Sequence, residues 1–572
     1  MIDRPTPPTV EFDTDFDTGL RFLQRWNAAT TGLHYLACVT RPMPLHSLHD
    51  GVASPLAEQS AALRRGWPSV APGSLAGFQR LSFAGGRVTL TLMTGQPEHC
   101  IAQCDARVNH FHVGSAIDPS RLARWLRRLA APDARLTLAT DVSGDALLHA
   151  GFVFCGPRQM RYAGLRRGCE EPASVPSFSA LPSPAHAIVI GAGLAGAAVC
   201  ERLAARGWRL TLLERHAAPA QEASGNLAGI MMPVLSRDEN PTARLSRAAF
   251  LYAVQQGRRF GFGGAECGVL QLARDDRHAA LQREIVARAG YPDRFVRCLT
   301  AAQGSALLDS TVTRGGWLFP QGGWANPAAV CAALLAACGD ALTVRYRVDV
   351  RTLRRVADGW CVLDQHGNAL AQASIVIFAN GNGATELAEL AGLPLQAVRG
   401  QVTHVAAADC RAPPLVVCGD GYVTPQSGAV CSIGASYDSH ADRALQRASQ
   451  EQNLARINTL LPDWIARAGE LPLAGRVGFR CVAPDRLPLI GALPGPLPSQ
   501  RVERLCDVPR WPGLYAALGY ASRGLTWAPL AAELLAAQLC HEPLPIEKDL
   551  AAALDPARFR LKELRRRPPS SN

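Results

Sequence analysis

Ala187-Ile-Val-Ile-Gly-Ala-Gly-Leu-Ala-Gly196 is the stretch that decides the fold of the larger part of this 572-residue chain. Its first four residues are apolar, as in a short buried strand, and Ala195–Arg206 continues with the apolar spacing of a helix. Arg209–Leu213 has the composition of a second strand, and Glu214 follows it directly. A strand, a glycine-rich turn, a helix and a strand within about 30 residues predict a βαβ unit.

The three glycines of this turn each meet a separate physical requirement. Gly191 permits a tight turn, Gly193 lets the backbone approach a pyrophosphate, and Gly196 lets helix and strand pack closely. The helix N-terminus then favours an anion. Glu214 lies where an acidic residue binds the ribose hydroxyls of a dinucleotide. We therefore predict a dinucleotide site, with an ordinary glycine-rich turn as the alternative.

Composition narrows the class of protein. Hydrophobic residues make up 48% and charged residues 19%, which excludes pervasive disorder. The 59 basic against 48 acidic residues give a net charge of +11, which fits an acidic macromolecular partner or none at all. Seventeen cysteines without a Cys-x-x-Cys pair indicate reduced thiols, so we expect neither a disulfide framework nor a metal site. No apolar run reaches the ~20 residues of a membrane span, and we expect a cytoplasmic protein without a membrane partner.

A proline-rich stretch divides the chain. Residues 170–186 contain four prolines, which disfavour helix and sheet, so we place a linker at 169–186. Beyond it, the alternating runs Thr343–Val350 and Gly359–Asp364 are typical of antiparallel strands. The sequence as a whole predicts a mixed α/β fold.

Six motifs follow one another in order along the second part of the chain: Pro219–Asn226, Phe319–Trp324, Val398–Gln401, Gly434–Tyr437, Pro484–Gly491 and Ser522–Thr526. They resemble the D-amino-acid-oxidase-like flavoprotein superfamily, which includes glycine and sarcosine oxidases. More closely, they resemble the C-terminal half of the bifunctional MnmC family of tRNA wobble-uridine-modifying enzymes.

The resemblance implies an α/β architecture of two parts. A Rossmann-like domain of the methyltransferase type occupies 1–168, an FAD-dependent oxidoreductase occupies 187–565, and 566–572 form a tail. The oxidoreductase combines a doubly wound FAD-binding domain with an antiparallel-sheet substrate domain. Its FAD-binding segments are expected at about 187–265, 321–398 and 475–545, and its substrate segments at about 266–320 and 399–474.

The resemblance also implies a reaction. The family uses FAD to remove the carboxymethyl group from 5-carboxymethylaminomethyl-2-thiouridine at position 34 of tRNA, which leaves 5-aminomethyl-2-thiouridine and releases glyoxylate. It then methylates the amine with S-adenosylmethionine. The implied partner is tRNA and not DNA. A glycine- or sarcosine-type oxidase acting on free amino acids, and a non-catalytic tRNA-binding scaffold, are the alternatives.

The same resemblance assigns site residues. Arg480 occupies the place of a carboxylate-binding arginine, whose planar fork suits such a ligand, and Tyr422 adds a hydroxyl. The residues expected to contact the flavin cofactor are Gly191, Gly193, Gly196, Glu214, Ser224, Gly225, Arg399, Gly519, Arg523 and Gly524.

The N-terminal region departs from its family's pattern. Phe16–Leu23 resembles the cofactor loop of the methyltransferase, but Asp15 and Asp17 stand where two glycines belong. The catalytic Asp-Gly-Phe-x-Pro stretch is replaced by Val113–Ile117, which lacks the acid. We therefore expect a degenerate domain, with S-adenosylmethionine as a cofactor by resemblance only and a surface for tRNA docking.

Overall fold

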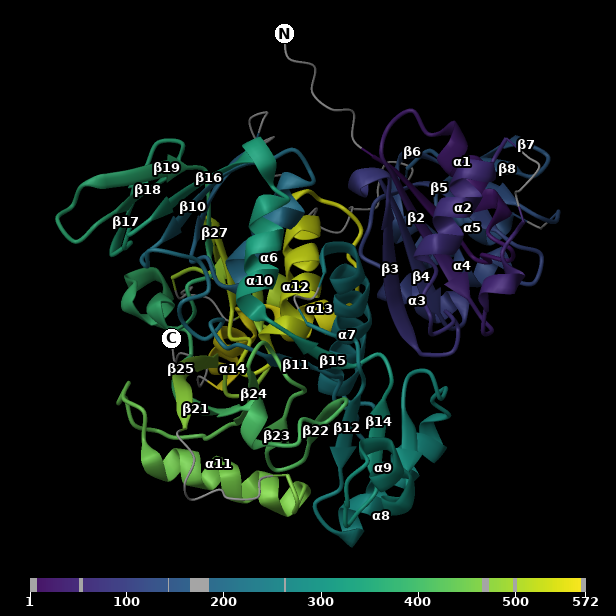
Figure 1. Cartoon of the computed structure of the whole chain (residues 1–572). Helices are drawn as coiled ribbons and strands as arrows, with labels where there is room; N and C mark the ends of the chain where they lie inside the picture. The colour runs from purple at the N-terminus through teal and green to yellow at the C-terminus, as the bar shows by residue number, and fades with distance from the viewer. Residues whose placement is uncertain are drawn as a thin grey trace. The chain divides into compact units, whose positions relative to one another are not determined.

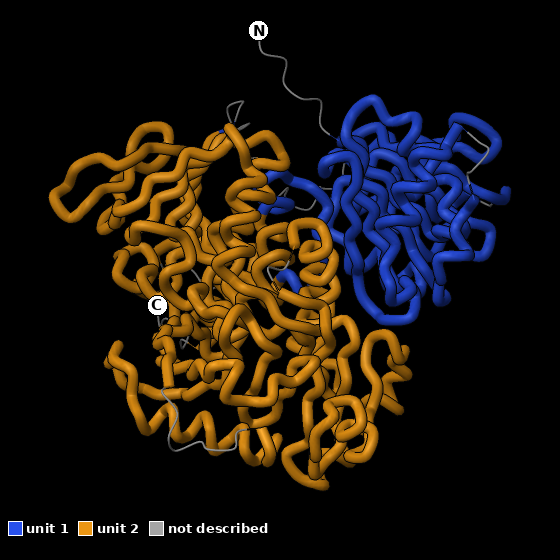
Figure 2. The backbone as a smooth tube through the Cα atoms, in the orientation of Figure 1, with its two compact units in different colours: residues 1–185, 536–551 blue, residues 186–535, 552–572 orange. Residues whose placement is uncertain are grey.

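The structure, a computed structural model, describes residues 8–50, 55–141, 144–164, 185–261, 264–464, 473–496 and 502–566. It divides into two compact units (Figure 2). Unit 1 comprises residues 1–185 and 536–551, and unit 2 comprises residues 186–535 and 552–572. Nearly all of the expected linker at 169–186, and all but one residue of the expected tail at 566–572, lie outside the described residues.

Unit 1 is built on one eight-stranded sheet whose central strands are parallel. The strands in spatial order are β3 (Gly77–Phe83), β4 (Val88–Thr94), β2 (Leu33–Val39), β1 (Thr9–Asp13), β5 (Val108–Val113), β6 (Ala130–Leu138), β8 (Gln159–Tyr162) and β7 (Phe152–Gly156). Helices cover both faces: α1 (Leu20–Ala28) and α2 (Ala57–Gly66) share one core, and α3 (Pro97–Gln103), α4 (Pro119–Leu129) and α5 (Asp145–His149) share the other. This arrangement confirms the predicted Rossmann-like fold.

In unit 2, a six-stranded sheet carries the glycine-rich turn. Its order is β16 (Leu342–Tyr346), β10 (Arg209–Glu214), β9 (His186–Ile190), β20 (Ile375–Phe378), β27 (Arg510–Leu518) and β26 (Leu489–Pro494). Only β26 runs antiparallel. Figure 1 shows α6 (Leu194–Ala204), α10 (Pro327–Ala336) and α12 (Gly524–Leu539) close together beside this sheet. The sheet β17 (Thr352–Val356), β18 (Gly359–Leu363) and β19 (Ala369–Ala373) packs on its core through Trp360 and Val362.

The second large sheet of unit 2 has eight strands. Their order is β13 (Arg297–Leu299), β14 (Gly316–Phe319), β12 (Val269–Leu272), β22 (Val416–Cys418), β23 (Tyr422–Val423), β24 (Val430–Gly434), β21 (Gln396–Ala406) and β25 (Ala474–Val482). All neighbours are antiparallel except β12 and β22. Leu454 and Ile457 of α11 (Arg447–Leu460) pack on one face with Val405, Val423 and Ile433. The two sheet types confirm the predicted doubly wound and antiparallel parts.

Three details differ from expectation. The strand expected at Thr343–Val350 is β16 (Leu342–Tyr346), which pairs in parallel with β10. Its residues alternate because it is an edge strand with exposed positions. β25 pairs with β21 along its length, so the flavin-side segment expected from residue 475 starts beyond Val482. Residues 536–545, also expected there, group with unit 1, where Arg80 Nη2 donates a 2.7 Å hydrogen bond to the carbonyl of Pro543.

Helix α7 (Pro241–Phe260) is the longest of the described helices. Its start is specified locally, because the Asn240 side chain accepts from the backbone N–H of Ala243 and Pro241 takes the first helical position. It carries Arg247 and, in its last turn, Arg258 and Arg259. In the part of the chain that the structure describes, neither α7 nor any other helix has the length and apolarity needed to cross a bilayer.

Candidate functional site

The glycine-rich turn between β9 and α6 forms a tight cradle. Gly191 has φ +101°, and a Cβ there would lie 2.8 Å from the carbonyl oxygen of Ala379. A Cβ on Gly196 would overlap the carbonyl oxygen of Gly191. Gly193 is the N-cap of α6. The backbone amides at the start of this helix therefore lie directly at the carboxyl end of β9, where they favour an anion.

Two predicted side chains meet this turn. Glu214, the last residue of β10, is 7% exposed and accepts hydrogen bonds from the N–H groups of Ala192 at 2.7 Å and His216 at 2.8 Å. The Ser224 hydroxyl accepts from the N–H of Leu194 at 3.1 Å. The remaining lone pairs of the Glu214 carboxylate are those that ribose hydroxyls require.

Gly225 lies in a loop that Arg476 of β25 holds in place. The guanidinium of Arg476 donates to the carbonyl oxygens of Gln221 and Glu222, each at 2.6 Å, and a Cβ on Gly225 would overlap this guanidinium. The loop with Ser224 and Gly225 is thereby tied to the antiparallel sheet.

Asn380 is a site residue that the sequence reading missed. It comes just after β20, which pairs with β9, and a Cβ on Gly191 would lie 2.8 Å from its Cα. The buried Oδ1 atom of Asn380 has no hydrogen-bond partner among the described residues. Ligands of doubly wound sheets bind at such carboxyl ends. The unpaired amide oxygen and the glycine cradle thus fit a dinucleotide such as FAD. The signal in the sequence was a polar residue two positions after the buried strand β20.

The strand register brings Arg480 and Tyr422 to one face of the antiparallel sheet. Arg480 pairs with Val398 on β21, and Tyr422 pairs with Gly434, which in turn pairs with Val402. Side chains alternate along a strand, so Val398 and Val402 share a face. The opposite face is covered by α11.

Arg480 has the surroundings of an anion-binding residue. Its Nη1 donates to the carbonyl oxygens of Arg399 and Ser436, both at 3.2 Å, and its guanidinium lies 4.1 Å from the ring centroid of Tyr437. Within the described ranges no carboxylate pairs with it. Tyr437 is 63% exposed and was not predicted as a site residue.

Arg523 and Tyr422 add to the same site. Arg523 directly precedes α12 and interacts electrostatically with Tyr437 and Cys418. Burial lowers the pKa of its guanidinium. The guanidinium has no hydrogen-bond acceptor among the described residues. Burial raises the pKa of Tyr422 to about 12, although the charge of Arg480 opposes this, so the hydroxyl remains a donor at neutral pH. Two guanidiniums without carboxylates, beside a phenol, suit a carboxylate ligand.

Three predicted flavin contacts have different surroundings. Arg399 is fully buried, with an ion pair to Asp438 at 2.8 Å and hydrogen bonds to the carbonyls of Asp442 and Ala444. Arg399 lies on the face of the sheet that α11 covers, and its guanidinium anchors the loop that contains Asp438, Asp442 and Ala444. We therefore do not retain it as a flavin contact. Gly519, with φ +77°, follows β27, and Gly524 begins α12. Both lie at the carboxyl end of β27, the same edge as Asn380, because β27 and β20 are parallel.

In unit 1, backbone amides of the turn after β1 are hydrogen-bonded to carboxylates of the same segment. Asp13 is buried and accepts hydrogen bonds from Arg21 and the Tyr35 hydroxyl, each at 2.6 Å. Its carboxylate also accepts from the N–H of Asp15, and the carboxylate of Asp15 accepts from the N–H of Asp17. The amides that would approach a cofactor are therefore satisfied within the loop.

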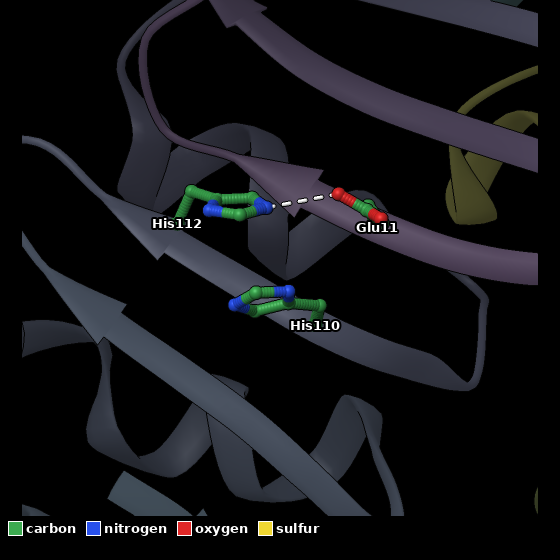
Figure 3. A group of neighbouring side chains, drawn as sticks. All are labelled: Glu11, His110 and His112. Atoms are coloured by element: carbon green, nitrogen blue, oxygen red, sulfur yellow. Dashed lines mark hydrogen bonds and ion pairs between the residues drawn. The ribbon is translucent and has the colours of Figure 1, made fainter. Parts of the chain in front are cut away.

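Unit 1 also contains three potential metal ligands that the sequence reading missed: Glu11, His110 and His112 (Figure 3). One ligand atom from each lies within 4.8 Å of the other two. The signal in the sequence was the alternation His110-Phe-His112 within an apolar strand.

Comparisons with known proteins agree with this geometry. The family DAO, FAD dependent oxidoreductase, matches residues 186–538. The chain is similar in structure to glycine oxidase from Geobacillus kaustophilus (23% identity, TM-score 0.51, 62% of this chain and 94% of that one) and to iminodiacetate oxidase from Chelativorans sp. BNC1 (23%, 0.51, 63% and 96%). It is 41% identical to the tRNA 5-methylaminomethyl-2-thiouridine biosynthesis bifunctional protein MnmC of Burkholderia thailandensis and 40% identical to that of Burkholderia pseudomallei; each alignment covers 97% of this chain and 90% of the relative.

Replacing Gly193 by alanine tests the cradle with little effect on the fold. Its φ of −79° suits any residue, and the added Cβ would meet the Ser224 hydroxyl at 3.1 Å. The methyl would stand where the backbone approaches a pyrophosphate, so we expect FAD affinity to fall about tenfold or more. Fluorescence titration of flavin-free protein measures this. Gly156→Ala, whose Cβ would make an ordinary 3.7 Å contact with Gln159, is the control; equal affinities in the two variants would contradict the assignment.

Proposed function

Because this chain belongs to the MnmC family of bifunctional tRNA 5-methylaminomethyl-2-thiouridine biosynthesis proteins and carries the FAD-dependent oxidoreductase domain DAO, we propose that it modifies the wobble uridine of tRNA. Its reaction is the oxidative removal of the carboxymethyl group from 5-carboxymethylaminomethyl-2-thiouridine. The observation that carries this assignment is a pair of guanidiniums beside Tyr422, those of Arg480 and Arg523, neither of which pairs with a carboxylate among the described residues. The partner is tRNA, and we place the reaction in the cytoplasm.

The cofactor is held by the cradle. Gly191, Gly193 and Gly196 would receive the pyrophosphate at the start of α6, and Glu214 would accept from the ribose hydroxyls. Ser224 and Asn380 offer polar atoms beside the same turn. Bound FAD supplies a two-electron acceptor for hydride removal from carbon.

The substrate is an N-substituted glycine, and its carboxylate determines its orientation. Arg480 binds the carboxylate through the donors that its two carbonyl contacts leave free, and the Tyr422 hydroxyl donates to the same group. This holds the α-carbon in one place, which removes much of the entropic cost of reaching the reactive geometry.

The bonds then change in a fixed order. The amine, in its neutral form, shares its lone pair with the α-carbon as that carbon loses a hydride to the acceptor, and the N–H proton is released. Water adds to the resulting carbon–nitrogen double bond. The C–N bond breaks, the aminomethyl uridine retains the nitrogen, and glyoxylate departs.

The exposed Tyr437 ring favours tRNA over a free amino acid as the substrate. Arg480 lies over the ring, and yet 63% of the residue is exposed. A nucleobase stacks on such a platform and gains about 1–3 kcal/mol per base. A free glycine derivative has no ring to place there.

The proposal is tested by anaerobic reduction of the bound flavin. We expect rapid bleaching at ~450 nm with tRNA that carries the carboxymethylaminomethyl group and none with unmodified tRNA, because only the former offers an oxidisable glycine carbon. Arg480→Met should slow bleaching about ten- to a hundredfold through the loss of a charged carboxylate contact. Reduction by free glycine or sarcosine alone would move the chain to the amino-acid oxidases, and a protein without flavin would exclude both enzymes.

Tyr437→Ala separates the nucleobase contact from the chemistry. We expect KM for modified tRNA to rise about five- to hundredfold, as lost stacking predicts, with little change in kcat. A small N-substituted glycine should be oxidised at the same rate by both proteins. Tyr515→Phe, a buried tyrosine of β27, is the control. An unchanged KM for tRNA would show that the ring does not contact the substrate.

We further propose that unit 1 no longer transfers methyl groups. The amides of Asp15 and Asp17 are taken by neighbouring carboxylates, and after β2 no carboxylate occurs before Asp50 to bind a cofactor ribose.

The expected outcome is that S-adenosylmethionine does not bind and that the tRNA product stops at 5-aminomethyl-2-thiouridine. Equilibrium dialysis with labelled S-adenosylmethionine and mass spectrometry of digested tRNA measure the two. A methylated nucleoside formed in the presence of S-adenosylmethionine would refute the loss.

A further inference from the structure

The middle of the unit 1 sheet brings two histidines and a carboxylate to one face. His110 and His112 are two residues apart on β5, so their side chains point the same way. β1 runs parallel to β5, and Glu11 is the residue paired with His110. Figure 3 shows the three side chains on neighbouring strands, with the ring of His112 directed at the Glu11 carboxylate.

The spacing of these groups suits one small cation. The Nε2 of His112 lies 2.9 Å from the Oε2 of Glu11, and the two imidazole centroids are 4.1 Å apart. Zinc bonds to nitrogen and oxygen of ~2.0–2.2 Å in a tetrahedral site place ligand atoms about 3.4 Å apart. The three ligand atoms lie within 4.8 Å of one another, so no pair of them has to approach by more than about 1.4 Å, which side-chain torsions supply.

Further contacts fix these ligands as metal sites require. Glu11 Oε1 accepts from Arg25 Nε at 2.6 Å, and the His110 Nε2 is 2.8 Å from the Thr137 hydroxyl. The His110 Nδ1 is left without a described partner. Such outer contacts set the ring orientation and the tautomer of a ligating histidine.

We propose that unit 1 binds a zinc-class divalent ion through Glu11, His110 and His112. Two histidines and one glutamate are a common zinc donor set, and three protein ligands leave one position for water. Unlike Glu11 and His112, His110 is only half-buried, which gives the ion a path from solvent. All three residues belong to unit 1, whereas the glycine-rich cradle belongs to unit 2.

Zinc binding by the full-length flavoprotein tests the proposal. After chelation and dialysis, zinc chloride is titrated by calorimetry and the bound metal is counted by mass spectrometry. We expect one ion per chain and, in His110→Ala, a loss of that ion or at least a tenfold weaker affinity. His99→Ala, an exposed histidine of α3, should bind like the parent protein.

A second variant distinguishes the loss of a metal ligand from misfolding of unit 1. Glu11→Gln retains an oxygen for Arg25 but removes the anionic ligand, and circular dichroism checks the fold. With Co²⁺ as the probe, the parent protein should show the intense visible bands of a four-coordinate site, and both variants should lose them. If His110→Ala and Glu11→Gln bind zinc like the parent, or the parent binds none, the three residues form only a polar network and the proposal is wrong.

Discussion

The contact between Gly196 and the carbonyl oxygen of Gly191 is the constraint on which the flavin side of unit 2 depends. Because no side chain separates them, α6 starts directly at the end of β9. Glu214 then reaches the N–H of Ala192, and Ser224 reaches that of Leu194. A methyl group at residue 196 would push the helix away and break both contacts together. Cofactor recognition here follows from backbone proximity more than from any single side chain.

The arrangement of Arg480 and its neighbours depends on the register between strands β21 and β25. Arg480 and Arg399 lie on neighbouring strands, but alternation sends their side chains to opposite faces. A slip of β21 by one residue would exchange the face that we propose binds the carboxylate for the face that α11 covers. Asn453 of α11 resists this slip, because its side-chain amide donates to the carbonyl of Gln401 at 3.0 Å and to the hydroxyl of Thr403 at 3.1 Å. The Asn453 contacts that fix the register therefore lie on the face opposite Arg480 and Tyr422.

The parts of the fold that depend on neighbouring residues or on family motifs could be predicted from the sequence. The β9–α6–β10 unit was predicted because its signals lie within one short segment, and the family and cofactor predictions were confirmed. Prediction failed where pairing is remote in sequence. The direction of β16 depends on its neighbour β10 and not on its own alternation, and Asn380 becomes a site residue only because β20 pairs with β9. The proposed roles of Arg480 and Tyr422 remain predictions.

Both units have a turn after the first strand of a largely parallel sheet, but the residues of the two turns differ. In unit 2 the turn after β9 carries glycines, and the side chains that bond its amides, Glu214 and Ser224, come from outside the turn. In unit 1 the same turn carries Asp13 and Asp15, whose carboxylates already bond the amides of Asp15 and Asp17. A ligand would have to replace these bonds and would gain little, since exchanging one hydrogen bond for another contributes only about 1 kcal/mol. The three residues of unit 1 that we propose as metal ligands, Glu11, His110 and His112, lie within β1 and β5 and not in this turn.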